Sequence, residues 1–153
     1  MRGFADALQS MTATLWVGGM WAIGFIVAPV LFATLPDRAL AGLLAGKLFS
    51  LIAWTGMACA ALLFFGRWVC HRRAVFHDPV LWIVVAMLAL TLTGEFGVQP
   101  VLADLRSQAL PQPAMESVQR DNFAYWHGVA GILYAANCLL GGALIVLQAL
   151  KHK

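Results

Sequence analysis

The stretch ALQSMTATLWVGGMWAIGFIVAPVLFATLP, residues 7–36, runs for 30 residues without an Asp, Glu, Lys or Arg. The hydrocarbon core of a bilayer is ~30 Å thick, and an α-helix needs ~20 apolar residues to cross it. A secretory signal peptide has an apolar region of only ~7–15 residues, followed by a small-residue cleavage site. This stretch is about twice that length and ends in Leu35-Pro36-Asp37. We therefore expect a retained transmembrane helix over about residues 7–34.

Three further stretches also lack charged side chains. They cover residues 48–66, 79–94 and 122–150. Of all residues, 61% are hydrophobic and 11% are charged, whereas soluble domains carry about 25% charged residues. The sequence thus predicts an all-α integral membrane bundle, formed as one transmembrane domain over residues 1–153. The four predicted helices span about 7–34, 38–68, 79–103 and 113–150.

The distribution of Lys and Arg predicts an orientation. Six of them lie on the side that holds the N-terminus, the second connection and the C-terminus, including Arg72, Arg73 and Lys153. The opposite side carries four, together with acidic residues. Positive charge favours the cytoplasmic side, so we expect both termini there. The net charge of +3 is read as a signal of topology, and we expect lipid rather than nucleic acid as the partner.

Glu95 is the one acidic residue well inside a predicted span. An ionised side chain at the bilayer centre costs ~2.5–3.5 kcal/mol on insertion scales, so it is expected to face the interior of the bundle. Thr91, Glu95 and Gln99 recur at four-residue steps and share one helix face. This pattern predicts a polar stripe on an otherwise apolar helix.

His127 is the one histidine inside a predicted span, and Tyr134 shares its helix face. Asn137 lies on the neighbouring face of the same helix. Glu95 is roughly 12 Å below the outer end of its helix, and His127 is roughly 8 Å below the same surface. The two ionisable groups are therefore at a similar depth on consecutive antiparallel helices.

Two interpretations of these residues remain open. In the functional one, Glu95 and His127 form an outward-opening site for a proton or a ligand, with Gln99, Tyr134 and Asn137 as further ligand-binding candidates. Kinks at Pro29 and Pro100 would widen the bundle at comparable depth. In the structural one, the polar groups satisfy one another and bind nothing. Lys47 would either join the pair or extend to the outer interface.

Sulfur-containing residues form a second layer at one depth. Four different predicted helices contribute one each: Met20, Cys59, Met87 and Cys138. Thiol and thioether groups bind soft metals such as Cu(I), yet Met and Cys are also adaptable apolar core residues. These four are metal-ligand candidates or core residues, and the sequence identifies no cofactor.

Small residues recur at steps of four, and once three, residues and indicate close helix contacts. They are Gly24 and Ala28, Gly42 and Gly46 continuing to Ser50 and Ala53, and Gly56 and Ala60. Such faces pack either a second copy of the chain, giving a homo-oligomer, or neighbouring helices of the same chain. The sequence leaves both arrangements open.

Several segments carry a family resemblance. They are Thr14-Leu-Trp-Val-Gly-Gly-Met-Trp21, Ala28-Pro-Val-Leu-Phe32, Asp37-Arg-Ala-Leu-Ala-Gly42, Lys47-Leu-Phe49 and Phe123-Ala-Tyr-Trp-His-Gly128. Together they resemble the bacterial branch of an uncharacterised family of four-helix membrane proteins related to eukaryotic transmembrane protein 205. The resemblance implies a multi-pass protein of the bacterial inner membrane. The eukaryotic relative is associated with resistance to platinum drugs, which would fit handling of a soft metal species.

Three functions follow as alternatives. The first is a non-enzymatic membrane protein that binds or passes a small solute or soft metal species through an outward-facing polar pocket. The second is a haem- or quinone-linked oxidoreductase with His127 as ligand. A distant likeness to a haem-containing membrane oxidase supports it, although no histidine precedes His71. The third is a structural or assembly subunit. No nucleophile triad, phosphate loop or HExxH helix is present, which favours a non-enzymatic role.

Overall fold

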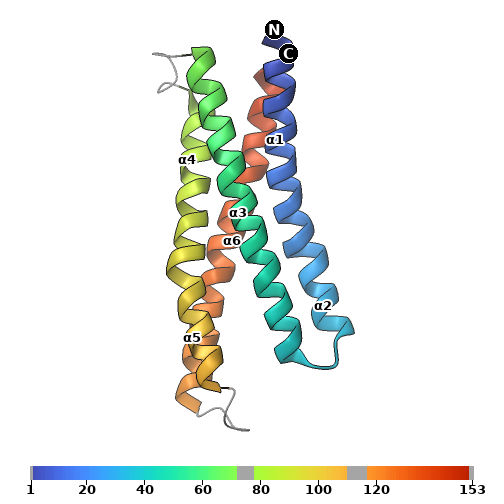
Figure 1. Ribbon diagram of the computed structural model, residues 1–153, viewed down its shortest axis with the longest axis vertical. Helices are drawn as coiled ribbons and strands as arrows, with labels where there is room; N and C mark the ends of the chain where they lie inside the picture. The colour runs from blue at the N-terminus through green and yellow to red at the C-terminus, as the bar shows by residue number, and fades with distance from the viewer. Residues whose placement is uncertain (1, 72–77, 110–116, 152–153) are drawn as a thin grey trace.

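The computed structural model describes residues 2–71, 78–109 and 117–151. They form an all-α bundle in which the chain runs along the long axis four times, and each such run is called a crossing below (Figure 1). The predicted start of the last helix at residue 113 lies outside the described residues, as do Arg72, Arg73 and Lys153.

The first and third crossings are each built from three consecutive helical elements. The first comprises α1 (Arg2–Ala22), the π-helical η1 (Ile23–Val27) and α2 (Ala28–Thr34). The second crossing is α3 (Arg38–His71). The third comprises α4 (Pro79–Leu92), the π-helical η3 (Thr93–Val98) and α5 (Gln99–Ala109), and the fourth is α6 (Ser117–Lys151).

Each crossing includes a span long and apolar enough to cross a membrane. The four spans are Ala7–Thr34, Arg38–Trp68, Pro79–Ser107 and Asp121–Leu150. The prediction of four long apolar helices is therefore confirmed, and contact with a lipid bilayer follows from it. The third span continues four residues beyond the predicted end at 103.

Aspartate and proline set the starts of two helices, as their residue types favour. The Asp37 side chain accepts a hydrogen bond from the Ala39 backbone N–H at 2.8 Å, before α3. At the start of α4, the Asp78 side chain accepts one from the Val80 backbone N–H at 3.0 Å, and Pro79 is the first helical residue. Asp78 also forms an ion pair with the buried Arg67 of α3.

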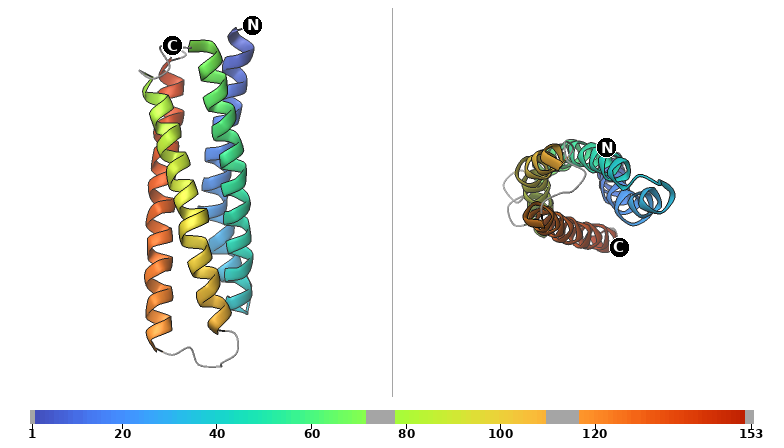
Figure 2. Two further views of the ribbon diagram at one scale, coloured as in Figure 1. Left: turned by 60° about the vertical axis from the view of Figure 1, so that its left-hand side comes forward. Right: turned by 90° about the horizontal axis from the view of Figure 1, so that it is seen from below.

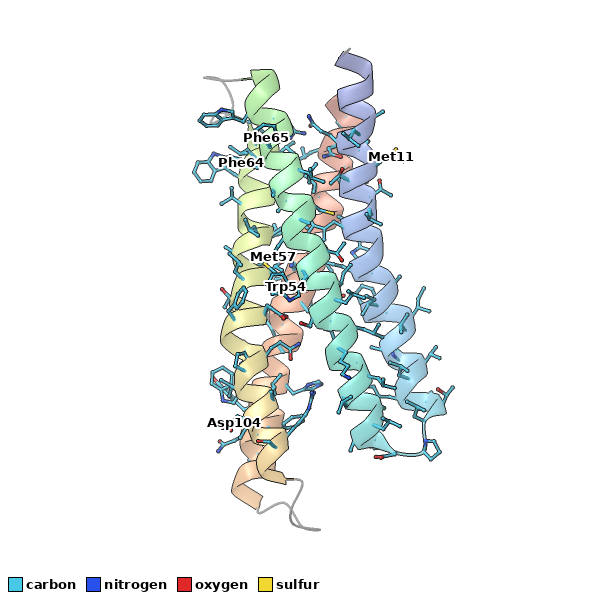
Figure 3. All side chains as sticks on the ribbon, in the orientation of Figure 1. Met11, Trp54, Met57, Phe64, Phe65 and Asp104 are labelled. Atoms are coloured by element: carbon cyan, nitrogen blue, oxygen red, sulfur yellow. The ribbon has the colours of Figure 1, made fainter. Side chains whose placement is uncertain are left out.

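Each long helix packs against the two beside it: α1 with α3, α3 with α4, α4 with α6, and α6 with α1. The core centres on side chains such as Trp16, Leu63, Met87 and Leu144, none of them more than 1% exposed. Other large apolar side chains lie on the outside of the bundle. Met11, at its edge in Figure 3, is 71% exposed, and Trp54 and Phe65 are 57% and 67% exposed. This is the arrangement expected of helices solvated by lipid.

The π-helical turns η1 and η3 occupy corresponding places in the first and third crossings. The N–H after each turn bonds to the carbonyl five residues earlier, Ala28 to Ile23 and Gln99 to Gly94. A proline follows directly in both cases, and segments 25–31 and 96–102 share Phe, Val, Pro, Val and Leu at equivalent positions. The two crossings thus repeat one local design.

Beyond these turns the bundle is splayed. The α2 segment packs on α3, whereas the first half of α6 packs on η3 and α5. In two views, α2 and the start of α6 lie on opposite sides of the bundle (Figure 2). The elements that follow the π-helical turns therefore separate, and the space between them forms the site described next.

Candidate functional site: a cavity between the four spans

A cavity of about 370 Å³ lies among all four crossings, in the splayed half of the bundle. At its inner end it is lined by Trp16, Met20, Thr91 and Asn137. Phe32, Gly42, Arg106 and His127 line its outer end. Since Thr91 precedes the end of its span at Ser107 by 16 residues, the cavity reaches ~24 Å into the bundle. Most of the remaining wall is apolar or made of small residues.

The five residues predicted to bind a ligand all line this one cavity: Glu95, Gln99, His127, Tyr134 and Asn137. They come from η3, α5 and α6. The structure therefore brings these residues together, while their role in binding stays a prediction.

Glu95 lies in η3, on the face that lines the cavity. The Ser50 hydroxyl of α3 donates a hydrogen bond to its Oε1. Among the described residues, no hydrogen bond or ion pair joins Glu95 to His127. The carboxylate thus finds an internal partner, as the cost of burying it requires, and that partner is a hydroxyl on another helix.

His127 lies at the cavity mouth and is exposed. Its ring stacks on Phe123, one turn earlier, with ring centres 5.9 Å apart and planes 10° apart. The Arg106 guanidinium of α5 lies 5.7 Å from the centre of the same Phe123 ring, within cation–π range. Lys47 is exposed and is not part of the cavity wall. The basic residue that lines the mouth is therefore Arg106, whereas the sequence analysis had considered Lys47.

Tyr134 ties α6 to the first crossing. Its hydroxyl donates to the Met20 carbonyl at 2.6 Å, and its ring meets Phe49 edge-on at 4.9 Å. A Cβ added to Gly24 would lie only 2.5 Å from the Tyr134 ring. Only glycine allows η1 to approach the tyrosine this closely.

Asn137 forms the polar contact at the inner end of the cavity. Its side-chain N–H donates to the Thr91 hydroxyl at 3.0 Å, and that hydroxyl donates to the Met87 carbonyl at 2.8 Å. Asn137 is 5% exposed, and its Oδ1 has no hydrogen-bond partner within the described part of the chain. A buried acceptor left without a donor costs roughly 1–3 kcal/mol.

Two residues of the site were missed from the sequence: Arg106, which lines the cavity, and Ser50, which does not line it but bonds to Glu95. Ser50 was read only as part of a small-residue face, although it bonds to Glu95. Arg106 lies 11 residues after Glu95, three helical turns along one face, and that spacing was the available signal. Cys138 lies in the buried core, and its neighbour Asn137 lines the cavity.

The four sulfur residues lie in one buried core cluster: Met20, Cys59, Met87 and Cys138. Of these, Met20 also lines the cavity. Cys59 and Cys138 are free thiols. The described residues contain no group of three or more His, Cys, Asp or Glu side chains suited to a metal ion. Metal binding by this layer stays a prediction.

The small-residue faces are used within the chain. A Cβ on Gly56 would overlap the Trp16 ring, and one on Gly46 would lie 3.1 Å from an Arg106 nitrogen. Gly42 and Ala53 line the cavity. These contacts account for the small residues inside one molecule, and a homo-oligomer stays a prediction.

Comparison with known proteins gives one match. A family model described as a domain of unknown function, DUF4149, matches residues 11–111, which is 101 of the 153 residues. The matched part holds most of the first span and all of the second and third, and His127, Tyr134 and Asn137 lie after it. No curated protein and no solved structure matches the chain. Because the model covers about two thirds of its length, the chain belongs to the DUF4149 family.

Proposed function

We propose that this multi-pass membrane protein binds a small, largely apolar ligand in the cavity between its four spans. One observation carries the proposal: Glu95, Gln99, His127, Tyr134 and Asn137 all line a single cavity of about 370 Å³. Ligand pockets typically measure ~300–1,000 Å³ and combine apolar walls with a few convergent polar groups. Ionisable residues inside a membrane are costly and are usually retained for function.

Both termini are proposed to be cytoplasmic, which directs the splayed half of the bundle outward. The cavity would then receive its ligand from the outer side of a bacterial inner membrane. We also propose that the chain is related to eukaryotic transmembrane protein 205. Most of the segments that resemble that family lie within residues 11–111, the part that the family model matches.

Binding is tested with three probes of equal chain length: n-octylammonium, 1-octanol and octanoate. A ligand that binds the folded state raises the unfolding temperature by mass action. The informative variant is Gly131→Leu, because Gly131 lines the cavity and an added Cβ there meets open space. The leucine side chain would therefore occupy part of the cavity, starting from a Cβ that meets no neighbour.

Gly128→Leu is the matched control. Gly128 lies one turn earlier on α6, is exposed, has no atom of the described chain near an added Cβ and does not line the cavity. At least one probe should stabilise the wild type and Gly128→Leu, and not Gly131→Leu. The proposal is wrong if no probe stabilises the wild type, or if Gly131→Leu responds as strongly as the control.

A soft metal species is the second candidate ligand. It is favoured by the position of Met20, which lines the cavity and also belongs to the buried sulfur cluster. Elemental analysis of purified protein tests it, and stoichiometric copper or another soft metal is the expected result. A Soret band near 400 nm would instead support the haem-linked alternative with His127, and a stable co-purifying membrane protein would support an assembly role.

A further inference from the structure

The inner part of the cavity has little hydrogen-bond donating capacity left. The Tyr134 and Thr91 hydroxyls and one N–H of the Asn137 amide are engaged within the protein, as is the Ser50 hydroxyl that bonds to Glu95. The donations run from Ser50 to Glu95, from Tyr134 to the Met20 carbonyl, from Thr91 to the Met87 carbonyl, and from Asn137 to Thr91. The Gln99 amide, one turn beyond Glu95 toward the mouth, makes no hydrogen bond among the described residues. A ligand that enters this region therefore meets groups that mainly accept hydrogen bonds.

Two acceptors there have spare capacity. The buried Asn137 Oδ1 has no partner among the described residues. An ionised carboxylate offers about four lone-pair sites, and the one hydrogen bond found for Glu95 comes from Ser50. Thr91, which binds Asn137, lies one turn before Glu95 on the same crossing. The two acceptors therefore lie about one helical turn, ~5–6 Å, apart along the bundle.

Aromatic side chains surround the same region. Trp16, Phe25, Phe49 and Tyr134 all line the cavity. Aromatic ring faces attract cations, and the attraction grows when the cation is desolvated. Together with Glu95, these rings make the inner cavity favourable for positive charge.

The basic groups lie at the other end. Arg106 stands over the Phe123 ring near the end of its span. His127 stacks on that same ring. Arg106 follows Glu95 by 11 residues, or ~16 Å along the helix. The cavity is thus polarised, with its negative group inside and its positive group at the mouth.

We propose that the ligand is an amphiphile with a protonated amine head, held between Glu95 and Asn137. The ammonium group would donate to both acceptors, and its apolar part would lie against Phe25 and Phe32 toward the splayed side of the bundle. This inference rests on the proposed function, because it names the class of ligand for that cavity. The amine could belong to a free lipophilic amine or to a lipid with a primary ammonium headgroup.

The test compares dissociation constants of n-octylammonium, 1-octanol and octanoate for the full chain in phosphatidylcholine nanodiscs. We expect n-octylammonium to bind at least tenfold more tightly than either other probe. In Glu95→Gln, its affinity should fall about tenfold or more, since the ammonium group would lose a hydrogen bond to a charged acceptor. The affinity for 1-octanol should stay unchanged.

Asp104→Asn is the matched control, because it removes one negative charge from an exposed α5 residue outside the cavity wall. It should leave all three affinities unchanged. The three dissociation constants are also compared in the wild type alone, so the test can be made even if Glu95→Gln folds poorly. Tighter binding of 1-octanol or octanoate overturns the inference and leaves the proposed function standing. Absence of binding by every probe overturns both.

A second arm separates the two sources of the amine. Replacing half of the phosphatidylcholine by phosphatidylethanolamine adds a lipid ammonium group at high local concentration. If the lipid is the natural ligand, the apparent affinity for n-octylammonium should fall several-fold in the wild type. An unchanged affinity assigns the site to a free amine, and an increase in affinity contradicts the ammonium site.

Discussion

At the scale of single residues, close packing depends on pairs of one large and one small side chain. The indole of Trp16 is completely buried and lies against Gly56 of α3. Lipid supplies no hydrophobic force between helices, so such contacts provide packing energy that holds the bundle together. The Trp16–Gly56 contact also forms part of the floor of the cavity, since Trp16 lines its inner end.

Gly56→Ala should destabilise the folded protein by about 1–3 kcal/mol, the usual cost of overpacking a core. The added methyl group would overlap the Trp16 ring, and a fully buried indole has little room to move. Thermal unfolding in one detergent gives the comparison, with Gly128→Ala as a control that meets no neighbour among the described residues. Equal stability of the two variants would show that Trp16 is not packed on α3 as described.

The partner of Glu95 shows what the residue types could and could not predict. The cost of a carboxylate in lipid predicted an internal companion, and one exists. The sequence pointed to His127 because depth follows from counting residues, whereas rotation about each helix axis does not. Ser50, short and uncharged, gave no signal of its own. Its bond to Glu95 links α3 to η3 and depends on how the second and third crossings are rotated toward each other.

At the scale of the elements, the π-helical turns set the shape of the cavity. Each holds one residue more per turn than an α-helix, which shifts the face of the segment that follows. The prolines after them lack the N–H that a regular helix would use, so the wider turn costs no additional hydrogen bond. The α2 and α5 segments then diverge from the axis of the bundle and leave room between them.

Replacing both Pro29 and Pro100 by alanine should weaken n-octylammonium binding several-fold. Alanine restores the N–H that can bond one turn earlier, which favours regular α-helix and draws the two segments together. Pro36→Ala, in the connection between α2 and α3, is the control and should bind as the wild type does. Unchanged or tighter binding by the double variant would show that the π-helical turns do not keep the cavity open.

The positions of the helices along the sequence were predictable, because long uncharged stretches indicate the spans and Asp-Pro pairs indicate where helices begin. The absence of charge over 30 residues and the Asp-Pro boundary at Asp78-Pro79 act locally, so no knowledge of neighbours is needed. The π-helical turns were not predicted, although Pro29 and Pro100 were identified as kinks. Helix faces drawn at a constant 100° per residue do not hold across such a turn, because its hydrogen bonds run between residues five apart.

At the scale of the whole molecule, two similar crossings face each other across one cavity. In membrane transporters, interrupted helices at corresponding places in two halves often surround the substrate site. Here η1 and η3 take that arrangement, and the cavity lies beside both. The shared residues of segments 25–31 and 96–102 support a two-fold design that a search for hydrophobic runs alone did not reveal.

Thiol accessibility tests most directly whether the cavity is open and reaches deep into the bundle. Gln99→Cys, inside the cavity, is compared with Phe96→Cys, a 57% exposed position outside the cavity wall. The native cysteines at 59, 70 and 138 are first replaced by serine or alanine, and intact spheroplasts are treated with a membrane-impermeant thiol reagent. We predict rapid labelling of Gln99→Cys from the outer side and at least tenfold slower labelling of Phe96→Cys, because thiolates form poorly in lipid. Equally slow labelling of both positions would contradict an open cavity between the four spans.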